Sequence, residues 1–300
     1  MPQTLYLHTY SPIHIGTGAS LEPAEYELVR GVFYRLHPER LFGAVLDQHS
    51  DASSRLMQWI EERAKKQDRT VDNRVASELR RQSLFDFVEK QLYDAPLARR
   101  LENDLAAYSV YAMPGPAALQ SAVREQLKTA TGELYIPGSS IKGMLRTALL
   151  YRALKGPDPG LRGVLKQALQ RAARMNWQDR QKRRKMANDL EARVLGCGVQ
   201  NNRRMDYDDP RFSLTRFLVV SDTEARPAAE IGRVVNVDLY LLDGQKQNQA
   251  PPVEAIREGV TLPFRLGIDL AGLREILEGI RQQRSVKIGG NRLVLGTEAW

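Results

Sequence analysis

Leu134-Tyr-Ile-Pro-Gly-Ser-Ser-Ile-Lys-Gly-Met-Leu-Arg-Thr-Ala-Leu-Leu150 is the stretch that decides the fold of this chain, because it predicts a strand, a tight loop and a helix in succession. Its first three residues favour a strand, and Pro137 ends that strand because proline cannot donate to a sheet ladder. Ser139 or Ser140 is expected to cap the helix. The apolar residues that follow have helical spacing and form one predicted face: Ile141, Met144, Leu145, Ala148 and Leu149.

The start of this predicted helix suits an anion. Its first N–H groups carry partial positive charge, and two serine hydroxyls and the cations Lys142 and Arg146 stand beside them. A phosphate is expected to bind there. The alternative is a capped helix whose cations are only solvated. The loop is not a nucleotide-hydrolysing P-loop, because Lys142 precedes Gly143 and the order Gly-Lys-Ser/Thr is absent.

A second glycine-containing loop follows the first predicted strand, residues 4–10. Gly16 and Gly18 bracket Thr17 there, and glycines permit positive φ and expose backbone N–H groups to a phosphate or sugar. A plain tight turn explains the same pattern. His14 in this loop suits stacking on a base or carrying a proton, although a structural role is the commoner one.

Three segments carry a resemblance to a known family. Residues 136–148 resemble the signature loop of the RAMP superfamily, the RNA-binding subunits of CRISPR–Cas effector complexes. Residues 11–18, with Leu21-Glu22-Pro23 and Tyr26, are similar to the opening of the subunit-five family of type III-A (Csm) complexes. Residues 212–222 are similar to a later segment of that family, and the three keep its order.

The resemblance implies an α+β protein with the ferredoxin-like, RNA-recognition-like RAMP fold and helical insertions. It implies a non-catalytic subunit without a cofactor or metal, which caps the protein filament at the 3′ side of the guide RNA and aids guide maturation. Its partners would be guide and target RNA, the backbone RAMP subunit and other Csm subunits, and host trimming nucleases. The expected RNA-binding residues are His14, Gly16, Thr17, Gly18, Gly138, Ser139, Ser140, Lys142, Gly143 and Arg146.

Two alternatives stay open. One is a RAMP endoribonuclease, with His14 as general base, Lys142 stabilising the scissile phosphate and Asp222 in a metal-assisted cut. The other is the equivalent capping subunit of a type III-B (Cmr) complex, which shares the Gly-Ser-Ser-Ile-Lys-Gly loop.

Positive charge is concentrated in one part of the chain. The 300 residues carry a net charge of +8, and residues 161–204 alone hold twelve Lys or Arg against three acidic residues, a surplus of 12 − 3 = 9. Such a concentration indicates a polyanionic partner, the alternative being a solvated helical face. It adds five candidate RNA contacts: Arg180, Lys182, Arg183, Arg184 and Lys185.

Composition narrows the remaining possibilities. The single cysteine, Cys197, excludes an internal disulfide and a multi-cysteine zinc site, which fits a reducing cytoplasm. Neither a signal peptide nor an apolar run of about 20 residues is visible, so no membrane partner is expected.

The order of predicted elements suggests two ferredoxin-like units with insertions. We expect an N-terminal unit at residues 1–157 containing a helical insertion at about 51–107, a basic helical insertion at 158–206 and a C-terminal unit at 207–300. Within them we expect hairpins at 26–36 and 253–268, and helices from Pro38 and over 270–280. Strands are expected at 108–113, 212–220 and 231–241, and a strand–turn–strand over 286–295. Residues 117–129 favour a helix by composition or else part of a long hairpin.

Overall fold

The computed structural model of the chain describes residues 2–66, 83–119, 121–157, 159–175, 213–240, 244–246 and 250–281, together with short pieces between 181 and 206 and between 286 and 293. The chain divides into two compact units, which are described separately. Unit 1 comprises residues 1–6, 137–223 and 263–300, and unit 2 comprises residues 7–136 and 224–262. Each unit is therefore assembled from segments far apart in the sequence.

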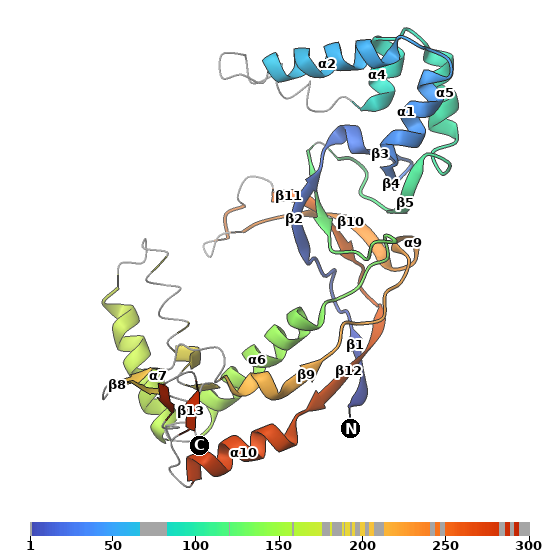
Figure 1. The fold of residues 1–300 in the computed structure, drawn as a ribbon. Helices are drawn as coiled ribbons and strands as arrows, with labels where there is room; N and C mark the ends of the chain where they lie inside the picture. The colour runs from blue at the N-terminus through green and yellow to red at the C-terminus, as the bar shows by residue number, and fades with distance from the viewer. Residues whose placement is uncertain are drawn as a thin grey trace. The chain divides into compact units, whose positions relative to one another are not determined.

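Unit 2 contains a four-stranded sheet in the order β10-β11-β6-β2 (Figure 1). Its strands are β10 (Gly232–Val237), β11 (Ala250–Ile256), β6 (Val123–Gln126) and β2 (Gly16–Leu21). β11 runs antiparallel to β10 and parallel to β6, and β6 runs antiparallel to β2. Since β6 is a strand, the helix favoured by composition over 117–129 is wrong there. The chain is extended as the hairpin alternative requires, but β6 pairs with β11 and β2.

A second sheet of unit 2, in the order β3-β4-β5, confirms the first predicted hairpin. β3 (Tyr26–Val29) follows a short 3₁₀ turn, η1 (Pro23–Glu25), and pairs with β4 (Val32–Leu36), which pairs in turn with β5 (Ser109–Pro114). Arg30 and Gly31, with φ of 50° and 76°, form the turn between β3 and β4. Two successive positive φ values match the twist of the flanking strands.

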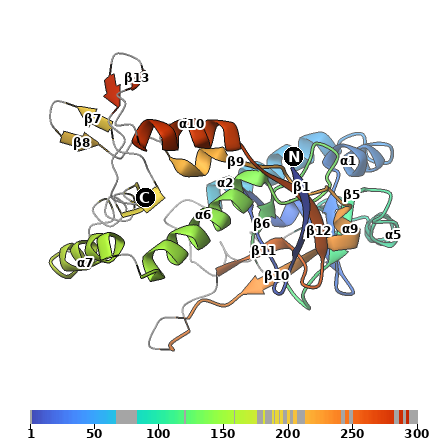
Figure 2. The ribbon, with the colours of Figure 1, turned by 90° about the horizontal axis from the view of Figure 1, so that it is seen from below.

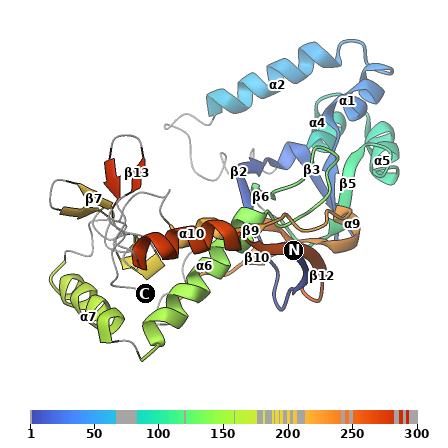
Figure 3. The ribbon, with the colours of Figure 1, turned by 60° about the horizontal axis from the view of Figure 1, so that its bottom comes forward.

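Four of the described helices pack together beside this sheet (Figure 3). They are α1 (Pro38–Leu46), α2 (Ala52–Lys66), α4 (Leu84–Lys90) and α5 (Ala95–Asn103). Pro38 stands at the first helical position of α1, as predicted. Leu41, Phe87 and Leu101 are at most 1% exposed at the centre of the cluster, so the insertion has its own apolar core.

Unit 1 is built around the helix predicted from the deciding stretch, α6 (Gly138–Lys155). β9 (Leu218–Val220), preceded by the 3₁₀ turn η3 (Leu214–Phe217), lies against α6. The strand predicted over 212–220 is thus interrupted by this 3₁₀ turn, and among its described residues only Leu218–Val220 belong to a named strand. α10 (Leu270–Arg281), as predicted, packs beside η3 (Figure 2), and α7 (Pro159–Ala173) follows α6 in the basic segment.

The second predicted hairpin is wrong in its pairing. β12 (Thr261–Ile268) does follow β11 after a turn at Gly259, whose φ is +76°. It pairs, however, with β9 and with β1 (Gln3–His8) in a separate three-stranded sheet ordered β1-β12-β9. The turn therefore passes the chain from one sheet to another.

The remaining described elements are short. α9 (Ala228–Ile231) precedes β10, and β7 (Val199–Asn201) pairs with β8 (Arg204–Asp206). β13 (Val286–Ile288) pairs with β14 (Asn291–Leu293), which confirms the two strands predicted over 286–295; the turn expected between them lies outside the described residues. Among the described helices, none has the length and apolar character needed to cross a membrane.

The deciding stretch differs from its prediction in two respects. Leu134 forms isolated bridges with Lys128 and Arg226 instead of belonging to a strand. On α6, Ile141 is 1% exposed, but Met144 and Leu149 are 53% and 45% exposed. The predicted apolar face is therefore covered only at its N-terminal end.

Candidate nucleic-acid interface

The first residue of α6 is a glycine because the helix begins against the end of β9. A Cβ atom at Gly138 would lie 2.5 Å from the carbonyl oxygen of Val220 and 2.8 Å from the carbonyl carbon and oxygen of Ser221. These are backbone atoms, which cannot rotate away. The Gly138 position thus requires the absence of a side chain for packing, whatever else it does.

The helix N-terminus already holds a carboxylate. The N–H of Gly138 donates to Oδ1 of Asp222 at 2.7 Å. Pro137 is the N-cap, with no side-chain cap bond of its own, so the prediction of a serine N-cap is wrong. Asp222 supplies the negative charge that the helix dipole favours. A phosphate at this N-terminus would have to share it with, or displace, this side chain.

The other predicted contacts of α6 differ in exposure. Ser139 and Gly143 are exposed, whereas Ser140 and Lys142 are partly buried. Nothing lies within 4 Å of a Cβ atom built at Gly143, so its small size serves no packing purpose among the described residues. Arg146, with 45% of its side chain exposed, forms an ion pair with Glu191. Its positive charge is therefore partly neutralised within the protein.

The predicted N-terminal loop is the beginning of strand β2. The pairing of β2 with β6 is interrupted between Gly16 and Ser20, and Gly18 has a φ of +91° inside this bulge. Residues with a side chain rarely adopt such a φ, which explains why this position is a glycine. Residues 16–20 are exposed, and Ala19 N–H donates to the hydroxyl of Thr17 at 3.1 Å. The bulge presents a fixed stretch of backbone to solvent.

His14 is held by the protein itself. Its Nδ1 lies 2.7 Å from the carbonyl oxygen of Glu254, so Nδ1 carries the proton and donates. Its Nε2 lies over Gly16, 2.9 Å from the position of a Cβ atom there. Gly16 therefore makes room for the imidazole. This geometry fits the structural role that was one of the alternatives for His14. The bond to Glu254 uses Nδ1 and does not involve the other ring nitrogen, Nε2.

A buried polar network lies beneath this loop, and sequence reasoning missed it. Oε2 of Glu254, which is 0% exposed, accepts from Nζ of Lys128 at 2.5 Å and from the N–H of Gln126 at 3.0 Å. Oε1 of Glu254 accepts from the hydroxyl of Tyr111 at 2.6 Å. Burial and the charge of Glu254 raise the pKa of Tyr111, which keeps the hydroxyl protonated as a donor. Breaking one side of a buried ion pair costs about 3–5 kcal/mol.

The network reaches the loop through Gln126. The side-chain Oε1 of Gln126 accepts from the N–H of Ile15 at 2.8 Å. Its Nε2 is buried and has no hydrogen-bond partner within the described part of the chain. Sequence offered a signal for these residues: Glu254 is an acidic residue inside the apolar run Val253–Ile256, and a charge in such a strand needs a buried partner.

The predicted residues therefore fall into separate groups. His14 and residues 16–18 belong to unit 2, and residues 138–146 belong to unit 1. Arg180 and residues 182–185 lie outside the described residues. The structure thus brings together the members of each loop, and the assignment of these residues to RNA stays a prediction.

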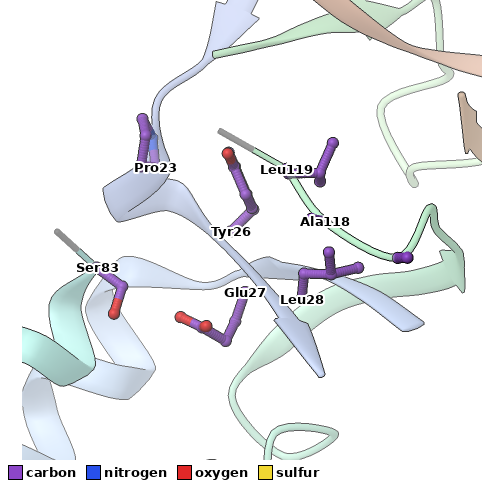
Figure 4. A pocket seen from close by; sticks show the side chains of 8 residues that line it. Pro23, Tyr26, Glu27, Leu28, Ser83, Ala118 and Leu119 are labelled. Carbon is purple, nitrogen blue, oxygen red and sulfur yellow. The ribbon is translucent and has the colours of Figure 1, made fainter. Parts of the chain in front are cut away.

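A small cavity in unit 2 is lined by none of the predicted residues (Figure 4). It has a volume of about 260 Å³, and its walls come from the start of β3, from Ser83 and from residues 117–119. Burial raises the pKa of Glu27 in its wall to about 7, with Glu102 and Asp86 adding to the shift and a hydrogen bond from Ser83 opposing it. Burial also raises the pKa of the neighbouring Tyr26 to about 12. The cavity presents a carboxyl group that titrates near neutral pH.

The residue considered for metal-assisted cleavage is bonded within the protein. No group of three or more His, Cys, Asp or Glu within the described ranges is placed to hold a metal ion. Asp222, the residue considered for such a role, accepts the N–H of Gly138 instead. Its carboxylate pairs with an N–H at the start of the helix that has no partner within the helix.

Comparisons with known proteins agree with this architecture. A family model described as the RAMP superfamily matches residues 6–269. The crystal structure of T. onnurineus Csm5 matches with a TM-score of 0.64 and 24% identity, over 91% of this chain and 70% of that chain. A cryo-EM structure of a Csm–crRNA–target RNA ternary complex of a type III-A CRISPR–Cas system matches with a TM-score of 0.56 and 21% identity, over 95% and 70%. No curated protein sequence matches. The two structural likenesses confirm the predicted fold.

Proposed function

Since this chain belongs to the RAMP superfamily, we propose that it is a non-catalytic RNA-binding subunit of a type III-A CRISPR effector complex. It caps the backbone filament at the 3′ side of the guide RNA and aids guide maturation. Its partners are guide and target RNA, the backbone RAMP subunit, the other Csm subunits and host nucleases that trim the guide. We also propose that the protein acts in the cytoplasm and that its chain is organised in three segments, divided at residues 157 and 206.

The observation that carries the proposal is the match of the family model over residues 6–269, which includes both predicted loops. Guide sequences vary, so a capping subunit must hold the sugar-phosphate chain without reading bases. Exposed backbone at the β2 bulge, exposed Ser139 and Gly143, and the nearby Lys142 are groups of that kind. The basic segment adds long-range attraction and a dependence of affinity on salt.

The structure changes what is expected of the two cations on α6. Each phosphate contact on single-stranded RNA contributes about 0.7 to the slope of log affinity against log salt concentration. Lys142→Ala should therefore flatten the slope by about 0.7. Arg146→Ala should flatten it less, because Glu191 already neutralises part of its charge. The measurement is guide-RNA binding by the full-length protein in the assembled complex between low and moderate salt.

Exposed Arg152, farther along α6, provides the control. It lies in the last turn of the helix, away from the proposed contact, and Arg152→Ala should leave the slope closer to the wild-type value than Lys142→Ala does. If Lys142→Ala leaves both affinity and slope unchanged, the α6 contact is not an RNA contact.

The absence of catalysis is tested separately. The purified full-length protein with guide-precursor RNA and Mg²⁺ should release no fragments. Cleavage that disappears in His14→Ala would instead support the endoribonuclease alternative. Co-purification decides between the Csm and Cmr assignments, because the neighbouring subunits of the two complexes differ.

A further inference from the structure

Four polar residues from three strands and a connection converge beneath the start of β2. Glu254 comes from β11, Gln126 from β6, Tyr111 from β5 and Lys128 from the connection after β6. Glu254 and Gln126 are 0% exposed, and the Lys128 side chain is 8% exposed. Buried charges and amides are costly unless their bonds are made.

The network holds the segment His14–Gly16 at two points. The backbone carbonyl of Glu254 accepts from the imidazole of His14, and the side-chain carbonyl of Gln126 accepts from the N–H of Ile15. The carboxylate of Glu254 in turn fixes the backbone of Gln126 at 3.0 Å. A third bond, from Leu127 N–H to the carbonyl oxygen of Ile15 at 2.8 Å, fixes the position of the loop backbone along the end of β6. The loop backbone is thus fixed before any ligand arrives.

We propose that Gln126 and Glu254 are positioning residues, which set the backbone of the bulged segment His14–Gly18 for contact with a phosphodiester chain. This inference rests on the proposed function and extends it to residues that are too buried to touch RNA. An ordered backbone binds more tightly because the cost of ordering it has been met in folding. Gln126 contributes this order at a cost, since its own Nε2 has no acceptor among the described residues.

The test uses Gln126→Met in the full-length protein and in the assembled complex. Methionine has a similar length, removes the acceptor of the Ile15 N–H, and also removes the unpaired Nε2. These two effects oppose each other in the folded state, so the melting temperature should change little. Hydrogen–deuterium exchange in the peptide containing Ile15 should become faster, and guide-RNA affinity should fall about tenfold.

Tyr111→Phe is the matched control. It deletes one hydrogen bond to Glu254 but no bond to the loop. It should lower the melting temperature while leaving exchange at Ile15 and RNA affinity near wild-type values. Equal losses of affinity in the two variants would show that binding follows general stability, and would overturn the proposal.

The outcomes separate this inference from the proposed function. Faster exchange at Ile15 without loss of affinity in Gln126→Met overturns the positioning role, and so does unchanged exchange. In both cases, weaker binding by Lys142→Ala would leave the proposed function standing. If neither Gln126→Met nor Lys142→Ala affects RNA binding, the proposed function fails with it.

Discussion

Two glycines of α6, only five residues apart, should respond in opposite ways to the same substitution. Gly138→Ala places a methyl group 2.5 Å from the Val220 carbonyl oxygen and 2.8 Å from backbone atoms of Ser221. Gly143→Ala meets nothing within 4 Å. The pair therefore isolates the packing requirement at the start of the helix from the intrinsic preference of alanine for helices.

The expected loss at Gly138 follows from the contacts. Relieving the clash requires α6 and the end of β9 to separate, and overpacking of this kind costs about 1–3 kcal/mol. The same movement lengthens the 2.7 Å bond from Gly138 N–H to Asp222, and a hydrogen bond to a charged group is worth about 1.5–3 kcal/mol. The total is about 2.5–6 kcal/mol. Gly143→Ala should instead stabilise by up to about 1 kcal/mol.

Urea unfolding followed by circular dichroism at 222 nm measures both values on full-length protein. Hydrogen–deuterium exchange of peptides from α6 locates the loss in Gly138→Ala. RNA affinity adds a second readout: if Gly143 is glycine because RNA comes close, Gly143→Ala weakens binding without loss of stability. A Gly138→Ala protein as stable as wild type would refute the packing argument for this position.

Two further predictions concern carboxylates. Asp222→Ala removes the carboxylate that accepts from the first N–H of α6 and should destabilise by about 1.5–3 kcal/mol. It also removes a negative charge beside the proposed phosphate contact, so RNA affinity at low salt should stay the same or rise; a clear fall would contradict the assignment. Glu27→Gln should alter the pH dependence of stability. Because the pKa of Glu27 is raised from 4.5 to about 7 in the folded state, protonated Glu27 stabilises the fold at low pH, and this stabilisation is lost as the pH rises from 4.5 to 7. Relative to wild type, the free energy of unfolding of Glu27→Gln should therefore increase by about 3 kcal/mol between pH 4.5 and pH 8. Thermal unfolding at both pH values checks this, and a difference independent of pH would contradict the raised pKa.

Local patterns were sufficient for several elements. The two strand-like segments on either side of Gly31 predicted the hairpin of β3 and β4, and the proline at position 38 predicted the start of α1. The spacing of apolar residues predicted α10. These features depend on neighbours in the sequence, where turn chemistry and periodicity act directly.

Features that depend on distant residues were not predictable in this way. The helical spacing in α6 identified residues on one face, but not that Met144 and Leu149 would be exposed. The cap of this helix comes from Asp222, 84 positions beyond Gly138. The pairing of β12 with β1 instead of β11 likewise depends on which strand the chain returns to. In each of these cases, the contacting residue or strand is distant in the sequence from the helix or strand that it contacts.

The candidate site shows the same division. Glycines in both loops were identified from sequence, and the structure gives Gly138 and Gly18 clear physical reasons to be glycine. The residues beneath the N-terminal loop were not identified, because Gln126 and Glu254 are 128 positions apart and meet only through the parallel pairing of β6 with β11.

The central claim is that the loops at residues 14–18 and 138–146 touch the guide RNA. The most direct measurement is ultraviolet crosslinking of RNA within the native complex, with crosslinked peptides mapped by mass spectrometry. Crosslinks from guide nucleotides near the 3′ end to peptides containing these two loops are the predicted result. Abundant guide crosslinks elsewhere in this subunit, with none in either loop, would contradict the account.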